Sequence, residues 1–207
     1  MIDIKYIGKF LNRDGVEGPR QTVGYIPCRP GNFYGRPNQD PARYSVIGVS
    51  GVTVATGVDL GQTDDEELRG YGVGEDLIRK LKPYLCRSSY HAIRVLANAP
   101  LSITEAEAEE LDDCVHRGEL ERYIRPCYEK ASGISFEDIP LQAQAVVFSI
   151  CYQLGCSGVK RRAPKTWAFL TARNWLSASE ELIHGFKGRN QYEGRRRIEG
   201  QLLAEVL

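Results

Sequence analysis

An α+β fold is predicted by three observations: strand patterns in the first third of the chain, helical apolar spacing in the rest, and one long uncharged segment. The chain has 207 residues, 42% hydrophobic and 26% charged, which is typical of a soluble globular protein. This length suits one well-packed domain or one domain with two lobes. We expect a small β-hairpin lobe at about 13–62, a larger helical lobe formed by helix 2–12 and about 63–207, and a cleft between them.

The first element is a short amphipathic helix at 2–12, because its apolar residues recur at helical spacing. It ends at the turn signal Arg13-Asp14-Gly15, so Glu17 sits just past a helix end beside the apolar Val16. A carboxyl held against apolar side chains keeps its proton to higher pH, as a general acid must. Glu17 is therefore a candidate acid and Asp14 its rival. A solvated loop glutamate is the alternative.

A first strand follows at 21–26, and it carries Tyr25. The segment 28–45 is then rich in Pro, Gly, Arg and Tyr, which excludes a central strand or helix. We interpret this long loop either as a flap that contacts the substrate or as a variable insertion. Val46 to Asp59 is expected to be strand again.

The segment Gly51–Gly61, GVTVATGVDLG, is an apolar strand that carries the hydroxyl of Thr53 and ends in the carboxylate of Asp59. Six residues of straight strand would separate these two side chains by ~20 Å, too far to share a substrate. The small residues at 55–57 give the chain a place to bend, because glycine relaxes the steric limits on the backbone. Such a bend would bring the hydroxyl and the carboxylate to one rim. The alternative is an ordinary hairpin strand flanked by glycines.

From residue 63 the pattern is helical. Capping boxes beginning at Thr63, Thr104 and Ser177 predict three helix starts, and the helix from 104 to about 128 is divided at Gly118 in one interpretation. Apolar spacing predicts the remaining helices at 75–85, 88–97, 165–173 and from about 194 to the end.

One segment, 139–159, carries no charge. Its glutamine and serine residues argue against a membrane span. We predict a buried helix that begins at Pro140, runs through Gln153 and is closed by Gly155. Its wide apolar surface makes it the centre of the helical lobe.

Charge and cysteine content exclude several classes of function. The 27 basic and 27 acidic side chains cancel, so no overall field favours nucleic acid or a membrane. The basic C-terminal stretch 157–207 could meet an anionic polymer, or it could be a solvated face. The six cysteines form no CxxC pair and the three histidines are scattered, so we expect no metal site and no cofactor. The cysteines are either reduced core residues or partly paired in disulfides.

Two carboxylates that flank a cleft can break a glycosidic bond. One protonates the departing oxygen, and the other assists water or the oxocarbenium-like transition state. A separation of ~6.5–9.5 Å leaves room for the water and inverts the anomeric centre. Thr53 would hold that water. The candidate residues that line the cleft and bind substrate are Tyr25, Tyr152 and Gln153. For each of them, a purely structural role is the alternative.

The chain resembles phage-type (T-even) lysozymes at four landmarks that occur in the same order. These landmarks are Glu17-Gly18, the strand 52–57, the run 103–108 (ITEAEA) and the run 151–159 (CYQLGCSGV). The segment 51–62, together with Lys82-Pro83-Tyr84-Leu85, is similar to pesticin-like proteins, bacteriocins whose killing domain has that lysozyme fold. The resemblance covers about residues 2–206.

This resemblance implies a lysozyme-like fold and muramidase activity, that is, hydrolysis of the β-1,4 bond between N-acetylmuramic acid and N-acetylglucosamine in peptidoglycan. Carried over by position, Glu17 is the general acid, and Thr53 and Asp59 complete the site. Phage lysozymes place their aspartate shortly after a tyrosine on the first strand. Here Tyr25 is followed by Ile26-Pro27-Cys28, and Asp59 takes that place, as in the pesticin-like pattern.

Two other functions remain open: a peptidoglycan-binding module without turnover, and a glycosidase acting on chitin-like chains. The N-terminus lacks the apolar core of a signal peptide, so we expect synthesis in the cytoplasm and action in the periplasm or cell wall of a target cell. The protein is then a phage endolysin or an antibacterial effector. An effector implies a cognate immunity protein that blocks the cleft. We expect a monomer without a nucleic-acid partner and without membrane insertion.

Overall fold

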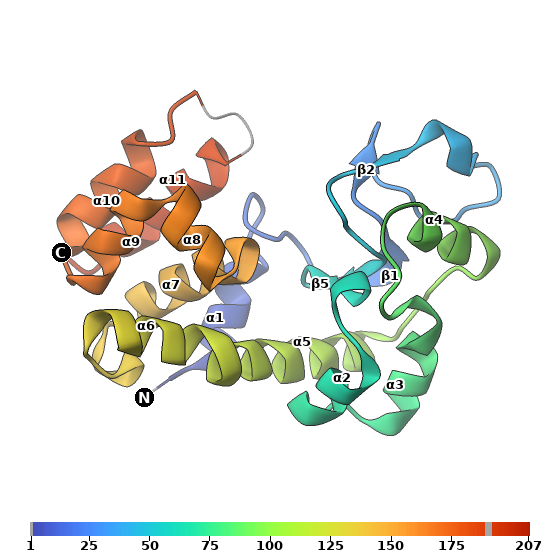
Figure 1. Ribbon diagram of the computed structural model, residues 1–207, viewed down its shortest axis with the longest axis horizontal. Helices are drawn as coiled ribbons and strands as arrows, with labels where there is room; N and C mark the ends of the chain where they lie inside the picture. The colour runs from blue at the N-terminus through green and yellow to red at the C-terminus, as the bar shows by residue number, and fades with distance from the viewer. Residues whose placement is uncertain (1, 189–191) are drawn as a thin grey trace. The chain divides into compact units, whose positions relative to one another are not determined.

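The computed structural model describes residues 2–188 and 192–207 (Figure 1). The chain forms two compact units. Unit 2 is continuous, from Pro19 to Val115, and unit 1 combines the segment up to Gly18 with the segment from His116 onward. The helices that follow the strands thus belong to the same unit as the strands, whereas the sequence analysis assigned them to the helical lobe. That the chain is a single domain stays a prediction.

Unit 2 contains the sheets. Its strands are β1 (Gln21–Tyr25), β2 (Cys28–Arg29), β3 (Ser45–Val46), β4 (Thr53–Ala55) and β5 (Val58–Asp59), and its helices are α2 (Asp65–Tyr71), α3 (Glu75–Leu81), α4 (Ser89–Asn98) and most of α5 (Glu105–Glu119). Three strands form an antiparallel sheet in the order β1-β4-β5, and β2 pairs with β3. Short 3-10 turns complete the unit at Pro41–Arg43, Leu60–Gln62 and Lys82–Tyr84.

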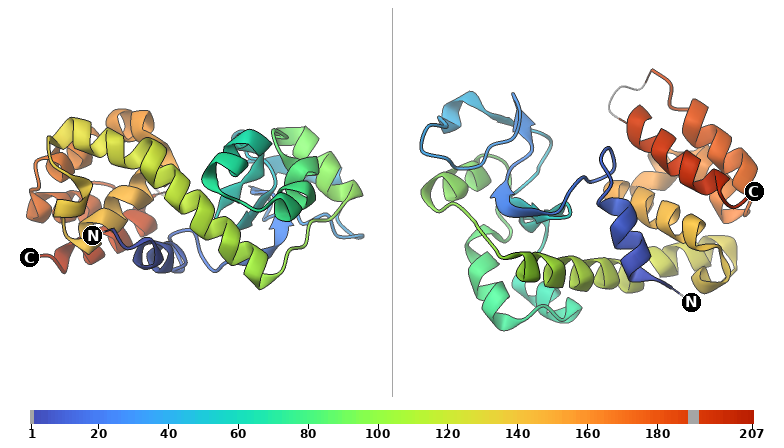
Figure 2. Two further views of the ribbon diagram at one scale, coloured as in Figure 1. Left: turned by 90° about the horizontal axis from the view of Figure 1, so that it is seen from below. Right: turned by 180° about the vertical axis from the view of Figure 1, so that it is seen from behind.

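Unit 1 is helical. It contains α1 (Ile4–Leu11), a π-helical turn (Leu120–Ile124), α6 (Arg125–Ser132), a 3-10 turn (Phe136–Asp138), α7 (Leu141–Leu154), α8 (Cys156–Arg162), α9 (Pro164–Thr171), α10 (Trp175–His184) and α11 (Glu193–Ala204). Both α1 and α11 pack against α7, and α10 lies beside α11 (Figures 1 and 2). The α+β fold class with a small β part and a helical part is confirmed.

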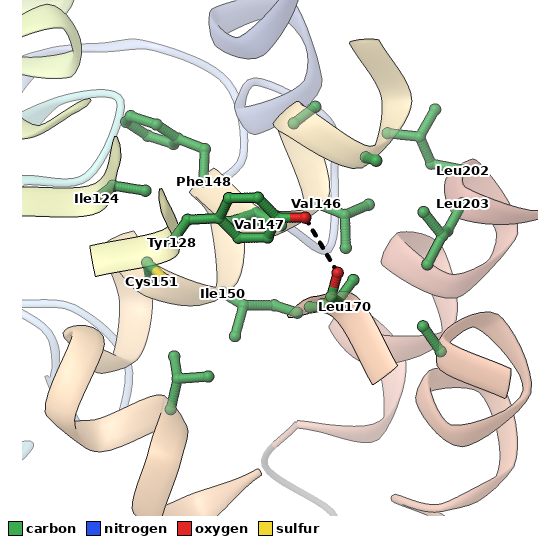
Figure 3. Packing of buried hydrophobic residues seen from close by; sticks show 14 of the residues in the cluster. Ile124, Tyr128, Val146, Val147, Phe148, Ile150, Cys151, Leu170, Leu202 and Leu203 are labelled. Carbon is green, nitrogen blue, oxygen red and sulfur yellow. Dashed lines mark hydrogen bonds between the residues drawn. The ribbon is translucent and has the colours of Figure 1, made fainter. Parts of the chain in front are cut away.

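The predicted central helix is confirmed as the core of unit 1. Nine residues of α7, from Ala143 to Cys151, are buried without interruption, because this helix is covered on all sides by α1, α8, α11 and the π-helical turn. Figure 3 shows Val146, Val147 and Ile150 of α7 close to Tyr128 of α6, whose hydroxyl donates to the carbonyl of Leu170 at 3.1 Å. Every helix among the described residues is too short or too polar to cross a membrane.

The segment 51–61 is not one bent strand, so that prediction is wrong in detail. It is a tight hairpin in which β4 and β5 pair directly, with Val54 opposite Val58. The reversal lies at residues 55–57, where Ala55 (φ 52°) and Gly57 (φ 76°) both adopt the left-handed conformation. Glycine accepts this conformation without steric cost, which explains why the run of small residues turns the chain here.

Several helix starts differ from the predicted ones. The capping box at Thr104 is confirmed, because Glu107 N–H donates to the Thr104 hydroxyl at 3.2 Å and Thr104 N–H donates to the Glu107 carboxylate at 2.7 Å. The other two boxes were wrong: Asp64 caps α2 and Asn174 caps α10. Gly118 lies inside α5, and the irregularity comes just after it, in the π-helical turn. Helix α8 was not predicted from the sequence.

Candidate active site

Glu17 lies in the turn that follows α1. Its backbone N–H donates to the carbonyl of Leu11 at 3.0 Å, and the N–H of Gly18 donates to the carbonyl of Arg13 at 3.2 Å. These bonds hold the turn against the end of the helix. The side chain of Glu17 is 20% exposed, whereas Asp14, its rival in the same turn, is exposed. The structure therefore favours Glu17 over Asp14 as a residue held in a defined position.

The partner of Glu17 is a guanidinium group rather than the apolar surroundings that the sequence suggested. Arg195 Nη1 of α11 lies 2.5 Å from Glu17 Oε1 and 3.4 Å from the carbonyl oxygen of Val16. The Arg195 side chain is only 6% exposed. A charge-assisted contact between partly buried groups is short and directional, so Arg195 orients the carboxyl group of Glu17.

Arg195 is itself held by a buried network. Its Nη2 donates to the carbonyl and the hydroxyl of Ser149, at 2.9 and 3.0 Å, and its Nε donates to Glu199 Oε1 at 3.2 Å. The Ser149 hydroxyl donates to the same Glu199 oxygen at 2.6 Å. Arg196 donates to the other Glu199 oxygen and to Gln153 Oε1. Glu199 is fully buried, and its charge compensates two buried guanidinium groups.

This network was not predicted from the sequence. The basic C-terminal stretch was expected to be a solvated face or a surface for an anionic polymer. The sequence does contain a pattern that indicates this network. Arg195 is four residues and Arg196 three residues before Glu199, and residues at these spacings are neighbours on the surface of a helix such as α11. Arg197 of the same run is exposed, as the solvated interpretation requires.

In unit 2 the sheet brings three predicted site residues into one row. Thr53 of β4 pairs with Asp59 of β5 on one side and with Tyr25 of β1 on the other. Directly paired residues in antiparallel strands project from the same face of the sheet. The hairpin thus places the Thr53 hydroxyl beside the Asp59 carboxylate, as the predicted bend required, although Thr53 is only 4% exposed. Its hydroxyl lies 3.4 Å from the carbonyl of Gly51.

Asp59 is held by the backbone at the base of its own hairpin. Its Oδ1 accepts the N–H groups of Gly51 and Gly61, both at 2.9 Å. Burial raises the pKa of Asp59 above its usual value, and the two backbone hydrogen bonds oppose part of that increase. Because both backbone donors use Oδ1, Oδ2 is the oxygen through which Asp59 could act on a bound water.

The tip of the hairpin is anchored by Asp112 of α5, a residue that the sequence analysis did not single out. Asp112 Oδ1 accepts the N–H of Thr56 at 2.8 Å, and Oδ2 accepts the Thr56 hydroxyl at 2.7 Å and Arg20 Nε at 2.8 Å. Asp112 and Thr56 are both buried. This carboxylate therefore positions the turn between Thr53 and Asp59.

The three predicted wall residues all have partners within their own units. The Tyr25 ring lies 6.0 Å from that of Tyr34. Tyr152 stacks on Phe148 at 5.5 Å and meets His116 edge-on at 5.4 Å, and Gln153 accepts from Arg196. Tyr25 and Tyr152 are half-buried. Their contact with substrate stays a prediction, as does the arrangement of Glu17 opposite Thr53 and Asp59 across a cleft.

The cysteines and potential metal ligands were also located. Within residues 2–188 and 192–207, no three His, Cys, Asp or Glu side chains come together as ligands of a metal ion would. All six cysteines are free thiols, and only Cys28 and Cys151 are buried.

A small antiparallel sheet that pairs Thr53 with Asp59, together with a helical unit that holds Glu17, defines a lysozyme-like α+β protein. A family model matches residues 2–176, most of the chain, and its description is "Pesticin: Bacterial toxin homologue of phage lysozyme, C-term". The chain belongs to this pesticin family. At the level of the family it is a lysozyme-like, peptidoglycan-degrading toxin. Comparison with curated proteins yields no match.

Proposed function

We propose that the protein is a muramidase that hydrolyses the β-1,4 bond between N-acetylmuramic acid and N-acetylglucosamine. It would act as an antibacterial toxin on the cell wall of a target bacterium. The observation that carries the proposal is the direct pairing of Thr53 with Asp59 in a pesticin-family chain that holds Glu17 in the turn after its first helix. These are the groups that glycoside hydrolysis requires: an acid, and a carboxylate with a hydroxyl for water.

In this mechanism Glu17 protonates the departing glycosidic oxygen. Arg195 contacts Oε1, so Oε2 is the oxygen that would deliver the proton. When Glu17 gives up its proton, the carboxylate that forms already has a cation beside it. The interaction with Arg195 is therefore stronger after proton transfer than before it, so in protein that binds substrate with Glu17 protonated it favours the transfer.

Asp59 and Thr53 act on the attacking water. The two backbone N–H groups hold Asp59 Oδ1, and Oδ2 accepts a proton from the water as it attacks. The Thr53 hydroxyl fixes the position of that water. A water activated by a carboxylate, with no covalent intermediate, inverts the anomeric centre. The product expected from a β-1,4 bond is therefore the α anomer.

The first experiment compares Glu17→Gln with Asp14→Asn, which changes an exposed carboxylate in the same turn. Rates of lysis of purified peptidoglycan are measured on both variants. General acid catalysis contributes about 10²- to 10⁴-fold, so Glu17→Gln should lose activity by that factor while Asp14→Asn keeps it. Circular dichroism and urea unfolding check that both variants are folded. Lysis at the wild-type rate by folded Glu17→Gln protein would remove Glu17 from the mechanism.

Asp59→Asn and Thr53→Ala should each lose several-fold to several-hundred-fold in rate. Proton NMR of the first product formed from a soluble peptidoglycan fragment reports the anomer directly, and a β product would contradict inversion.

Chitin oligomers, which lack lactyl and peptide groups, serve as the alternative substrate. Faster cleavage of chitin oligomers than of peptidoglycan would make the protein a chitin-type glycosidase. Binding to peptidoglycan without release of reducing ends would make it a binding module.

A further inference from the structure

Three cysteines converge in unit 1, and none of them has a role in the proposed glycoside hydrolysis. Cys127 is on α6, Cys151 on the last turns of α7 and Cys156 at the start of α8. The Cys156 side chain interacts with those of both Cys151 and Cys127, Cys151 and Cys156 line the same pocket, and the Cys156 Sγ lies 3.6 Å from the carbonyl oxygen of Tyr123. The three free sulfur atoms thus form one interacting cluster.

This cluster opens into a pocket of about 530 Å³. Cys151 and Cys156 line it, together with the cationic side chains of Arg122 and Arg161 and one carboxylate, Glu119. Lys160 lies one helical turn after Cys156 and interacts electrostatically with the thiols. The positive charges around the pocket outnumber the negative one, so the pocket favours a small anionic molecule.

The chemistry of the three sulfur atoms differs. Hydrogen bonding from Cys151 lowers the pKa of Cys156 to about 6, with further help from Cys127 and Lys160. Burial raises the pKa of Cys127 to about 11, and the pKa of Cys151 is also raised, chiefly because it donates to Cys156. Cys156 is therefore the thiol of the cluster that loses its proton most readily, and the thiolate is the nucleophilic form.

We propose that Cys156 is a thiol–disulfide exchange site for small acidic disulfides of the oxidised glutathione class, and that Cys127 or Cys151 supplies the second thiol. The Cys156 thiolate attacks one sulfur of the small disulfide, a mixed disulfide forms, and one small thiolate leaves. A neighbouring thiol then loses its proton to solvent and attacks Cys156 Sγ, which expels the second small thiolate. The small disulfide is reduced to two thiols, and two protein thiols become one disulfide.

The test incubates the full chain with oxidised glutathione at pH 6 and maps the modified cysteines by mass spectrometry. Cys86 is the matched control, because it is the exposed cysteine of the chain. Because the pKa of Cys156 is lowered to about 6, a much larger fraction of Cys156 than of an ordinary thiol is thiolate at this pH. The lower intrinsic nucleophilicity of a low-pKa thiolate cancels part of this advantage. The expected net preference for Cys156 over Cys86 is roughly tenfold, and faster reaction of Cys86 would overturn the proposal.

Variants separate the two steps of the exchange. Cys156→Ser should abolish both the mixed and the internal disulfide, whereas Cys86→Ser should leave both unchanged. The double variant Cys127→Ser/Cys151→Ala should stop at the mixed disulfide on Cys156. If that double variant fails to fold, the single variants Cys127→Ser and Cys151→Ala show by slower resolution which thiol takes part. Persistence of the mixed disulfide on Cys156 in the wild type, with no internal disulfide formed, would contradict the second step.

The charge of the pocket is tested with cystamine, a cationic small disulfide. Wild-type Cys156 should react several-fold faster with oxidised glutathione than with cystamine, and the variant Arg122→Gln/Arg161→Gln should lose this preference. An unchanged preference in that variant would show that the pocket does not select the disulfide. These measurements do not involve peptidoglycan, so their outcome is independent of the muramidase proposal.

Discussion

The two units hold their candidate catalytic carboxylates in different ways. In unit 1, Glu17 is held by a charge, Arg195, which lies 178 positions away in the sequence. In unit 2, Asp59 is held by backbone N–H groups two and eight positions away. The first carboxylate depends on long-range packing of α7 and α11, and the second depends mainly on the geometry of its own hairpin.

This difference shows two physical routes to a fixed carboxylate. A guanidinium group can reach far across a unit, but it must itself be compensated when it is buried, which is the role of Glu199. Backbone donors carry no net charge and need no such compensation, but they require close approach. A Cβ on Gly51 would lie 2.5 Å from the Cα of Gly61, so this approach depends on glycine at both positions.

The largest expected effect comes from breaking the charged support in unit 1. Glu199→Ala leaves Arg196 buried without its counter-charge and leaves Glu17 as the remaining carboxylate beside Arg195, and loss of one partner of a buried ion pair costs about 3–5 kcal/mol. Urea unfolding should show a decrease of this size in the free energy of unfolding. Glu205→Ala, an exposed site near the end of the same helix, should change it by no more than about 0.5 kcal/mol. Equal effects in the two variants would show that the network contributes nothing specific.

The next effect comes from breaking the tertiary anchor of the hairpin in unit 2. Asp112→Ala removes the acceptor for Thr56 and Arg20, and buried hydrogen bonds to a charged group are worth about 1.5–3 kcal/mol. We expect a loss of about 2–3 kcal/mol, together with a lower rate of peptidoglycan lysis because the turn between Thr53 and Asp59 loses its support. The neighbouring Asp113→Ala, which changes a less buried aspartate, is the control. Normal activity in folded Asp112→Ala protein would show that the hairpin keeps its shape without this anchor.

A smaller effect is expected from the turn itself. Gly57 has φ 76°, a conformation that costs an L-residue about 1–2 kcal/mol, so Gly57→Ala should destabilise the protein by that amount. Gly194→Ala places a methyl group where no atom lies within 4 Å, in α11, and should be neutral or slightly stabilising. Thermal unfolding of both variants measures the difference. Equal melting temperatures would mean that the turn tolerates alanine.

The smallest expected effect is a change with pH in the contribution of Asp59 to the free energy of unfolding. Because the pKa of Asp59 is raised in the folded protein, the folded state binds the proton more tightly than the unfolded state does. The resulting stabilisation is fully present below the unfolded pKa of about 3.8 and is lost as pH rises through the folded pKa. The free energy of unfolding of the wild type, relative to Asp59→Asn, should therefore decrease as pH rises across that window. A constant difference between pH 3 and 6 would contradict the effect of burial on Asp59.

Much of the fold was predictable because it follows from local pattern. Apolar periodicity located α1, α7 and α11, and the capping box at Thr104 was correct because both of its hydrogen bonds are local. The starts of α2 and α10 were misplaced, since aspartate or asparagine caps a helix as well as threonine or serine does. The short helix α8 was missed because it begins directly after Gly155, which ends α7.

The sequence by itself determined the α+β class, the buried central helix and the small-residue turn that sets Thr53 beside Asp59, because each depends on contacts between residues close in the chain. Only the tertiary structure decided that Glu17 meets Arg195, that Asp112 anchors the hairpin tip and that three cysteines share one cluster. The contacts of Glu17 and Asp112 join residues far apart in sequence, Cys127 meets the other two cysteines from a separate helix, and such side-chain pairing leaves no periodic signal. It depends on how helices pack, which residue spacing along the chain does not encode.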